Sequence, residues 1–271
     1  MSWRIGILIA LVSAVCLTVE SQVSPLGSPV HLPPTQQLPS PTLDCLPAKK
    51  QARLITVKVL SDQLLGSGVL IHREDQTYQV ITNAHVLQAG KAPYFIQTPN
   101  DGKIHPATPI ATTTKLQGND LALLQFEAPN LNYSVAKLAE KPIVREFVIA
   151  AGFPLENNTA EFKNQGNFVI KQGQIEWVLN KPLEGGYKIG YTNDIQKGMS
   201  GGPLLNCTGE VVSINGIHAD PVWGDPYVFQ DGSYPVNADR ERMSQYSWGI
   251  PIQTVVQLFP QLLMVQKPSK M

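Results

Sequence analysis

Short apolar runs alternate with turn-forming residues along most of the chain. From residue 52 onwards the runs are rich in Val, Ile and Leu, and Gly, Pro, Asn and Asp cluster between them. This spacing predicts strands joined by turns rather than helices. We expect strands over residues 53–60, 66–72, 78–82, 94–98, 121–126, 147–151, 167–171, 174–179, 187–191, 209–215 and 246–252.

The expected strands fall into two groups. A more polar segment, residues 127–141, lies between them. The one helical pattern is at residues 253–263, where Pro260 weakens the helix end. We therefore predict an all-β fold of two packed antiparallel six-stranded barrels with a short C-terminal helix. The N-terminal barrel is expected over residues 52–130, the C-terminal barrel and helix over 131–263, and a tail over 264–271.

The N-terminus has a different pattern, in which an uncharged apolar run at residues 5–19 follows Arg4. A transmembrane helix needs roughly 20 apolar residues, whereas the core of a secretory signal needs roughly 7–15. We interpret residues 1–21 as a signal peptide of a secreted or periplasmic protein, with a retained membrane anchor as the alternative. Residues 22–51 are rich in proline and are interpreted as an extended linker.

The composition is that of an ordinary globular protein, with 43% apolar and 15% charged residues. Lys and Arg together number 21, and so do Asp and Glu, so the formal net charge is zero. A balanced charge gives no reason to expect binding to nucleic acid or to an anionic membrane surface. We expect a monomer without a cofactor.

Two cysteines lie outside the N-terminal apolar run, Cys45 and Cys207. In an exported chain they form a disulfide or stay as two buried thiols, and the sequence favours neither outcome. No C-x-x-C pair and no nearby pair of histidines accompanies them, so we expect no metal site.

A serine stands among glycines in the stretch KGMSGGP, at Ser200. As G-x-S-x-G the stretch matches the nucleophile elbow of α/β-hydrolases, which needs a helix after the serine and an acid and a histidine later in the chain. Here a turn and another strand follow, and the only later histidine is His218, close to the serine. The other interpretation, an active serine that follows its histidine and its acid in the chain, fits the context better.

Four motifs in order carry a resemblance to a known family: GSGVLI, ITNAHVL, NDLALLQF and GMSGGPLLN, the last followed by GEVVSING. Over residues 52–263 the chain resembles trypsin-like serine proteases of the chymotrypsin superfamily. It is most similar to bacterial members such as glutamyl endopeptidases, Deg-type proteases and cyanobacterial trypsin-like proteins. The resemblance implies barrels of the chymotrypsin type and an exported endopeptidase that acts on polypeptides through an acyl-enzyme.

The resemblance also assigns roles to single residues. Ser200 would be the nucleophile, His85 the general base, and Asp120 the carboxylate that orients the imidazole. The backbone N–H groups of Gly198 and Ser200 would form the oxyanion hole. Animal trypsins carry an aspartate where this chain has Met199, so we expect no activation by insertion of a new N-terminus.

The resemblance implies a substrate preference at P1 only through the positions of residues relative to Ser200. Asp194 lies six residues before Ser200, where a trypsin-type carboxylate would bind a basic P1 side chain; its alternative role is structural. The wall of the pocket is expected from Ser213, Ile214, Asn215 and Gly216. Asn215 replaces the substrate-reading histidine of glutamyl endopeptidases, which argues against acidic P1 residues.

Two rival functions stay open from the sequence. One is a catalytically silent secreted binding or scaffold protein on a protease fold, and the other is an esterase-type hydrolase with the same catalytic groups. For the long connection over residues 220–245 the sequence leaves two functional roles open, a border of the substrate cleft and a cation site at Asp225 and Asp231. The spacing of the aspartates matches no known calcium loop, so packing is the expected role.

Overall fold

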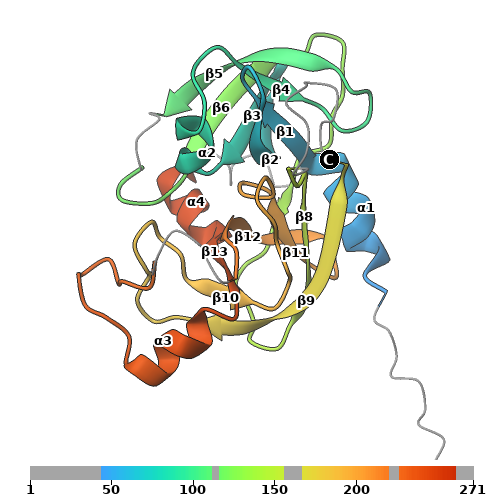
Figure 1. Cartoon of the computed structure of the whole chain (residues 1–271). Coiled ribbons are helices and arrows are strands. Elements are labelled where there is room, and N and C mark those ends of the chain that lie inside the picture. The colour runs from blue at the N-terminus through green and yellow to red at the C-terminus, as the bar shows by residue number, and fades with distance from the viewer. Residues whose placement is uncertain (1–43, 112–115, 156–166, 220–225, 261–271) are drawn as a thin grey trace, which may run out of the picture. The chain divides into compact units, whose positions relative to one another are not determined.

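The computed structural model describes residues 44–111, 116–155, 167–219 and 226–260. These described residues form one compact unit (Figure 1). The expected signal peptide, most of the expected linker and the expected tail lie outside the described residues. No helix within the described ranges has both the length and the apolar character needed to cross a membrane.

The first barrel is closed by six antiparallel strands in the order β1-β2-β3-β6-β5-β4. Its strands are β1 (Thr56–Leu60), β2 (Leu64–Glu74), β3 (Thr77–Thr82), β4 (Tyr94–Gln97), β5 (Ile104–Ala111) and β6 (Ala122–Glu127). The pattern of the sequence did not predict β5, because Pro106 and Pro109 lack the N–H that a strand ladder uses. The pairing of β5 with β6 shifts register after Pro109, which accommodates the proline.

The second barrel also has six antiparallel strands. Along the sheet they follow the order β11-β8-β9-β10-β13-β12, and pairing of β11 with β12 closes the ring. They are β8 (Phe147–Gly152), β9 (Val169–Val178), β10 (Ile189–Tyr191), β11 (Pro203–Asn206), β12 (Glu210–Ile217) and β13 (Ser247–Pro251), while β7 (Lys137–Leu138) adds a parallel pairing to β12. The two expected strands at 167–171 and 174–179 are one strand, β9. The predicted fold of two six-stranded barrels is confirmed.

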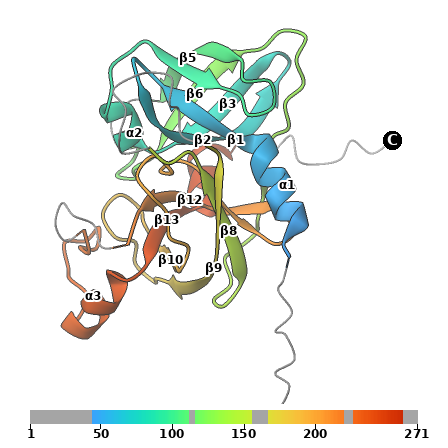
Figure 2. The same ribbon diagram turned by 45° about the vertical axis from the view of Figure 1, so that its right-hand side comes forward.

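Helix α1 (Leu46–Ile55) differs from the prediction, which gave a linker up to residue 51 and a strand from residue 53. Pro47 lies in the first helical turn, where a missing N–H costs nothing. Ala48, Ala52 and Ile55 are fully buried on one face, and this packing stabilises the helix. Figure 2 shows α1 running along the side of the molecule where the two barrels adjoin.

Three further helices are short. Helix α4 (Ile252–Leu258) follows β13 directly and confirms the helix expected near the C-terminus, although it begins and ends earlier than residues 253–263. Helix α3 (Asn237–Met243) lies in the connection for which no helix was predicted. Helix α2 (Ala84–Gln88) follows β3 and carries His85.

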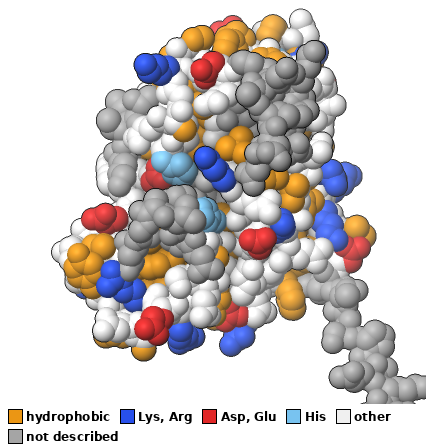
Figure 3. Space-filling model, viewed as in Figure 1, with side chains coloured by type: hydrophobic (Ala, Val, Ile, Leu, Met, Phe, Trp, Pro, Cys, Tyr) orange, Lys and Arg blue, Asp and Glu red, His pale blue; other side chains and the backbone are white. Residues whose placement is uncertain are grey.

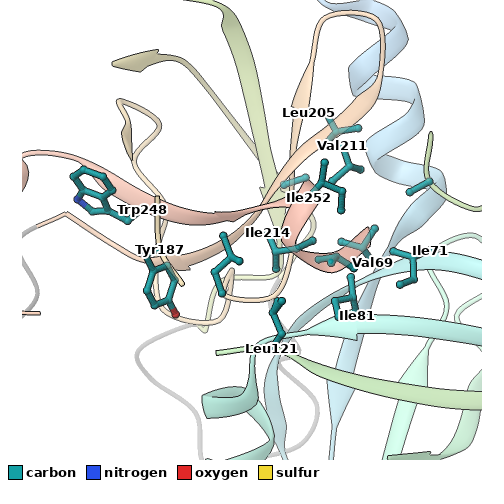
Figure 4. Close-up of a cluster of buried hydrophobic side chains, with 14 of the residues drawn as sticks. Val69, Ile71, Ile81, Leu121, Tyr187, Leu205, Val211, Ile214, Trp248 and Ile252 are labelled. Atoms are coloured by element: carbon teal, nitrogen blue, oxygen red, sulfur yellow. The ribbon is translucent and has the colours of Figure 1, made fainter. Parts of the chain in front are cut away.

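Strands that are buried on both faces explain the unbroken apolar runs of the sequence. In β6, Ala122, Leu124 and Phe126 point into the first barrel, whereas Leu123 belongs to the cluster shared by the two barrels. Successive side chains of a strand point to opposite faces, so each face of β6 meets a separate core. Figure 4 shows part of the shared cluster, in which Val69 and Ile81 of the first barrel lie near Ile214 and Ile252 of the second half.

A disulfide joins Cys45 to Cys207. Cys45 is the N-cap residue of α1, and Cys207 follows β11, so the bond ties the helix to the second barrel. The bonded residues are 162 positions apart in the sequence. A crosslink over a long loop lowers the entropy of the unfolded chain.

We therefore expect the double variant Cys45→Ala/Cys207→Ala to lose about 2–4 kcal/mol in its free energy of unfolding. Urea unfolding followed by tryptophan fluorescence measures the loss, and wild-type protein treated with a reductant is the matched control. Two free thiols in native, untreated protein would contradict the disulfide.

Candidate active site

His85 and Asp120 come together at one edge of the first barrel. His85 lies on α2, just after β3, and Asp120 lies just before β6, the neighbour of β3. The Nδ1 atom of His85 is 2.5 Å from Oδ2 of Asp120. The main-chain N–H of His85 donates to Oδ1 of the same carboxylate at 2.9 Å. Since one residue supplies both donors, the imidazole has a fixed orientation relative to the carboxylate.

The carboxylate of Asp120 is buried and remains ionised. Its side chain is 8% exposed. Burial raises its pKa, but the hydrogen bonds and charge of His85 and the hydroxyl of Tyr187 lower it by more, so the pKa lies below its ordinary value. An ionised Asp120 favours the imidazole tautomer with hydrogen on Nδ1, which leaves Nε2 able to accept a proton.

Ser200 lies in the turn that leads into β11. Its hydroxyl donates to the carbonyl oxygen of Gly216 at 3.1 Å, and within the described ranges it makes no hydrogen bond to His85. Of the expected triad, His85 and Asp120 are thus hydrogen-bonded to each other, whereas the hydroxyl of Ser200 is bonded to β12. The hydroxyl has to exchange this hydrogen bond for one to the imidazole before His85 can take its proton.

The loop that carries Ser200 is held by the first barrel through Ser67 of β2. The N–H of Ser67 donates to the carbonyl of Ser200 at 2.9 Å, and its buried hydroxyl donates to the carbonyl of Gly198 at 2.8 Å. That hydroxyl also accepts the N–H of Phe153 at 2.9 Å. One small side chain therefore fixes the loop against both barrels.

The backbone N–H groups of Gly198 and Ser200, on either side of Met199, have no acceptor among the described residues. The carbonyl of Lys197 accepts the N–H of Leu155 at 2.8 Å, and the carbonyl of Met199 accepts the N–H of Gly202 at 3.1 Å. In a trans peptide the N–H points away from the carbonyl, so both N–H groups are turned away from these anchors.

Position 198 requires glycine. Its φ is +94°, and a Cβ there would lie 2.5 Å from the carbonyl oxygen of Phe153 and 2.7 Å from the nitrogen of Leu155. A side chain would displace the loop and turn away the two N–H groups. The arrangement thus offers two unpaired donors beside a serine, as an oxyanion hole needs.

A pocket of about 450 Å³ opens beside the His85–Asp120 pair. Its apolar lining includes Tyr187, Ile217 and Pro226. Pale-blue histidine side chains reach the surface near the middle of the face in Figure 3, at the level where Figure 1 shows the two barrels meeting. A largely apolar pocket next to a base is suited to hold a substrate side chain.

Asp194 does not have the setting that was expected for it. Its side chain is 75% exposed, and its carboxylate lies 3.6 Å from Nζ of Lys171 on β9. A carboxylate that selects a basic side chain has to be buried and unpaired at the base of a pocket. The structure instead places Asp194 in an ion pair at the surface.

The four residues expected for the pocket wall have different settings in the structure. Ser213, Ile214 and Asn215 are fully buried, and Ile214 belongs to the core shared by the barrels. The Asn215 amide accepts from the hydroxyl of Tyr191 at 2.9 Å and donates to the carbonyl of Pro203 at 3.2 Å, so it is held inside the second barrel. Gly216 alone of the four lines the pocket beside His85.

Two further predictions concern single residues. Met199 is fully buried in the core of the second barrel, which suits its apolar side chain. Asp231 is paired with Lys181 at 2.6 Å, and Asp225 lies outside the described residues. No cluster of side chains suited to a metal ion occurs within the part of the chain that the structure describes.

Sequence reasoning missed two residues of this site, Ser67 and Tyr187. Ser67 stands in the motif GSGVLI, whose small residues signalled a strand start but not a contact with the Ser200 loop. Tyr187 donates a hydrogen bond to Oδ2 of Asp120 from a segment 67 positions away. Nothing in the local pattern around either residue indicates its partner.

Comparison with known proteins adds a family match. The model of the trypsin-like peptidase domain matches residues 66–214. The mitochondrial serine protease HTRA2 of Drosophila grimshawi is 34% identical over 160 residues, which are 55% of this chain and 33% of that protein. The serine protease Do-like HtrA of Bacillus subtilis is 31% identical over 159 residues, which are 55% of this chain and 32% of that protein. The matched part is thus about a third of each relative.

A solved structure shows the same fold. The serine endoprotease from Yersinia pestis superposes with a TM-score of 0.57 at 21% sequence identity. The match covers 84% of this chain and 68% of that one.

Proposed function

Because the chain belongs to the family of trypsin-like peptidases, we propose that it is an exported serine endopeptidase that cleaves polypeptides through Ser200, His85 and Asp120. The observation that carries the proposal is the buried carboxylate of Asp120, which binds both Nδ1 and the main-chain N–H of His85. This arrangement leaves Nε2 of His85 as a base on the side of the pocket.

The reaction begins when the Ser200 hydroxyl leaves the Gly216 carbonyl and turns to His85. Nε2 of His85 takes the hydroxyl proton as Oγ of Ser200 forms a bond to the scissile carbonyl carbon. The carbonyl oxygen becomes negative and accepts hydrogen bonds from the N–H groups of Gly198 and Ser200. Asp120 stabilises the imidazolium that forms at this step.

The intermediate then collapses, and the bond between carbon and nitrogen breaks. The imidazolium gives its proton to the leaving amine, and the acyl group stays on Oγ of Ser200. Water next gives a proton to Nε2 of His85 and its hydroxide to the acyl carbon. The bond to Oγ breaks, Oγ regains the proton, and a carboxylic acid leaves.

Proteolysis and ester hydrolysis separate this function from its two rivals. The full chain is incubated with unfolded β-casein, and the products are sequenced by mass spectrometry. We expect new internal termini within the casein chain, together with hydrolysis of blocked amino acid esters. Ester hydrolysis without casein fragments would support an esterase, and neither activity in folded protein would support a scaffold.

Asp194 gives a prediction about specificity. Because its carboxylate is exposed and paired with Lys171, Asp194→Asn should change the ratio of kcat/KM for Lys and Leu at P1 by less than about twofold. Peptide substrates that differ only at P1 measure this ratio, and Asp44→Asn is the matched control, because the Asp44 carboxylate is also exposed and paired with a lysine, Lys49. A selective loss of cleavage after Lys would show that Asp194 binds the P1 side chain after all.

A further inference from the structure

Tyr187 contacts the proposed triad from the second barrel. Its hydroxyl donates to Oδ2 of Asp120, the same oxygen that binds Nδ1 of His85. The main-chain N–H of His85 occupies Oδ1. Among the described residues the carboxylate thus has three donors, two from His85 and the third from Tyr187.

The segment around Tyr187 is shaped to hold its ring in this place. The turn before β10 is closed by the N–H of Leu183, which donates to the carbonyl of Tyr187 at 2.8 Å. The tyrosine is 4% exposed and packs in the core between the barrels, where Figure 4 shows its hydroxyl end pointing away from Trp248.

Gly216 makes room for the ring. A Cβ at this position would lie 2.1 Å from Cε1 and 2.6 Å from the hydroxyl oxygen of Tyr187. The carbonyl of Gly216 also accepts the hydroxyl of Ser200. The phenol ring thus lies between the carboxylate of Asp120 and the strand segment that contacts Ser200.

The hydroxyl of Tyr187 is a permanent donor. Burial, and then the negative charge of Asp120, raise its pKa well above the ordinary value, so the phenol is neutral wherever the enzyme works. A neutral hydroxyl bonded to a carboxylate spreads the negative charge and fixes the oxygen in place.

We propose that Tyr187 is a positioning residue that holds the Asp120 carboxylate in register with His85 and moderates the charge that His85 senses. The inference rests on the proposed function of the triad. The ring of Tyr187 lines the pocket, but its hydroxyl touches no reacting atom and acts through Asp120.

Tyr187→Phe tests this role because it removes the hydroxyl and keeps the ring. Loss of one hydrogen bond to a charged group should lower kcat by about tenfold, with KM changed by less than about twofold. The carboxylate then keeps more of its charge and stabilises the imidazolium more strongly, so the acid limb of the kcat/KM profile should move to higher pH.

A matched control is Tyr78→Phe. Tyr78 is also fully buried, and its hydroxyl donates to the carbonyl of Leu131 inside the first barrel, away from Asp120. This variant should lose stability but keep kcat and the pH profile of the wild type. An equal loss of kcat in both variants would show that Tyr187 has only a structural role and would contradict the inference.

Site-specific replacement of Tyr187 by 3-fluorotyrosine keeps the hydroxyl and makes it a stronger donor. The acid limb should then move to lower pH, opposite to the shift in Tyr187→Phe, and this test holds even if Tyr187→Phe does not fold. Active protein with an unmoved acid limb in the fluorinated protein would overturn the inference. Inactive wild type would instead refute the proposed function, so the two failures are distinguishable.

Discussion

Replacement of Ser200 by alanine is expected to lower kcat for peptide hydrolysis by about 10⁶-fold. The variant lacks the oxygen that forms the acyl-enzyme, whereas the backbone N–H groups at positions 198 and 200 and the pocket beside His85 stay in place. We therefore expect KM and the melting temperature to change little. Single-turnover hydrolysis of a fluorogenic peptide measures the loss.

Ser244→Ala is the matched control for this variant. Ser244 follows α3, and its hydroxyl donates to the carbonyl of Glu241 at the surface. It should retain the full rate of the wild type. Residual activity of Ser200→Ala above about 1% of wild type would exclude Ser200 as the nucleophile.

Replacement of Asp120 by asparagine should lower kcat by about 10⁴-fold. The amide has the shape of the carboxylate but carries no charge. Its NH₂ group is a donor, so it cannot accept a hydrogen bond from the Nδ1–H of His85. The imidazole is then held as the wrong tautomer, with Nε2 protonated, and cannot take the proton of Ser200. The loss should appear in kcat, measured with the same fluorogenic peptide.

The Asp120→Asn variant also has an expected pH dependence of stability. The pKa of Asp120 is lowered in the folded protein, so the ionised carboxylate stabilises the fold at neutral pH, and this contribution is lost as the pH falls through the lowered value. The difference in unfolding free energy between wild type and variant should therefore persist at pH 7 and shrink below about pH 4.

In the activity assay, a kcat of Asp120→Asn within about tenfold of wild type would contradict the role of Asp120.

The period of the apolar positions predicts most of the fold. Strand β6 is predicted from its continuous apolar run, which arises because Leu123 and Leu124 face two different cores. Helix α1 cannot be predicted in this way, since it depends on the burial of Ala48 and Ala52 and tolerates Pro47 only because this proline lies in the first turn. Tertiary packing decides such segments, and local propensity does not.

Residues of the site differ in the same way. His85, Asp120 and Ser200 stand in motifs whose order in the chain predicts their roles. The role expected for Asp194 rests only on its distance along the chain from Ser200, and that distance does not reveal its ion pair with Lys171 at the surface. The contact of Tyr187 with Asp120 joins two segments through the fold, and only the three-dimensional arrangement reveals it.

The most direct test of the central claim is covalent labelling of the full chain with a fluorophosphonate, followed by peptide mass spectrometry. A fluorophosphonate reacts much faster with a serine that a neighbouring base activates than with other serines. We predict one adduct on Ser200, a much slower reaction in His85→Ala and none in Ser200→Ala. A folded wild-type protein that stays unlabelled, or carries its adduct on another serine, would contradict the account.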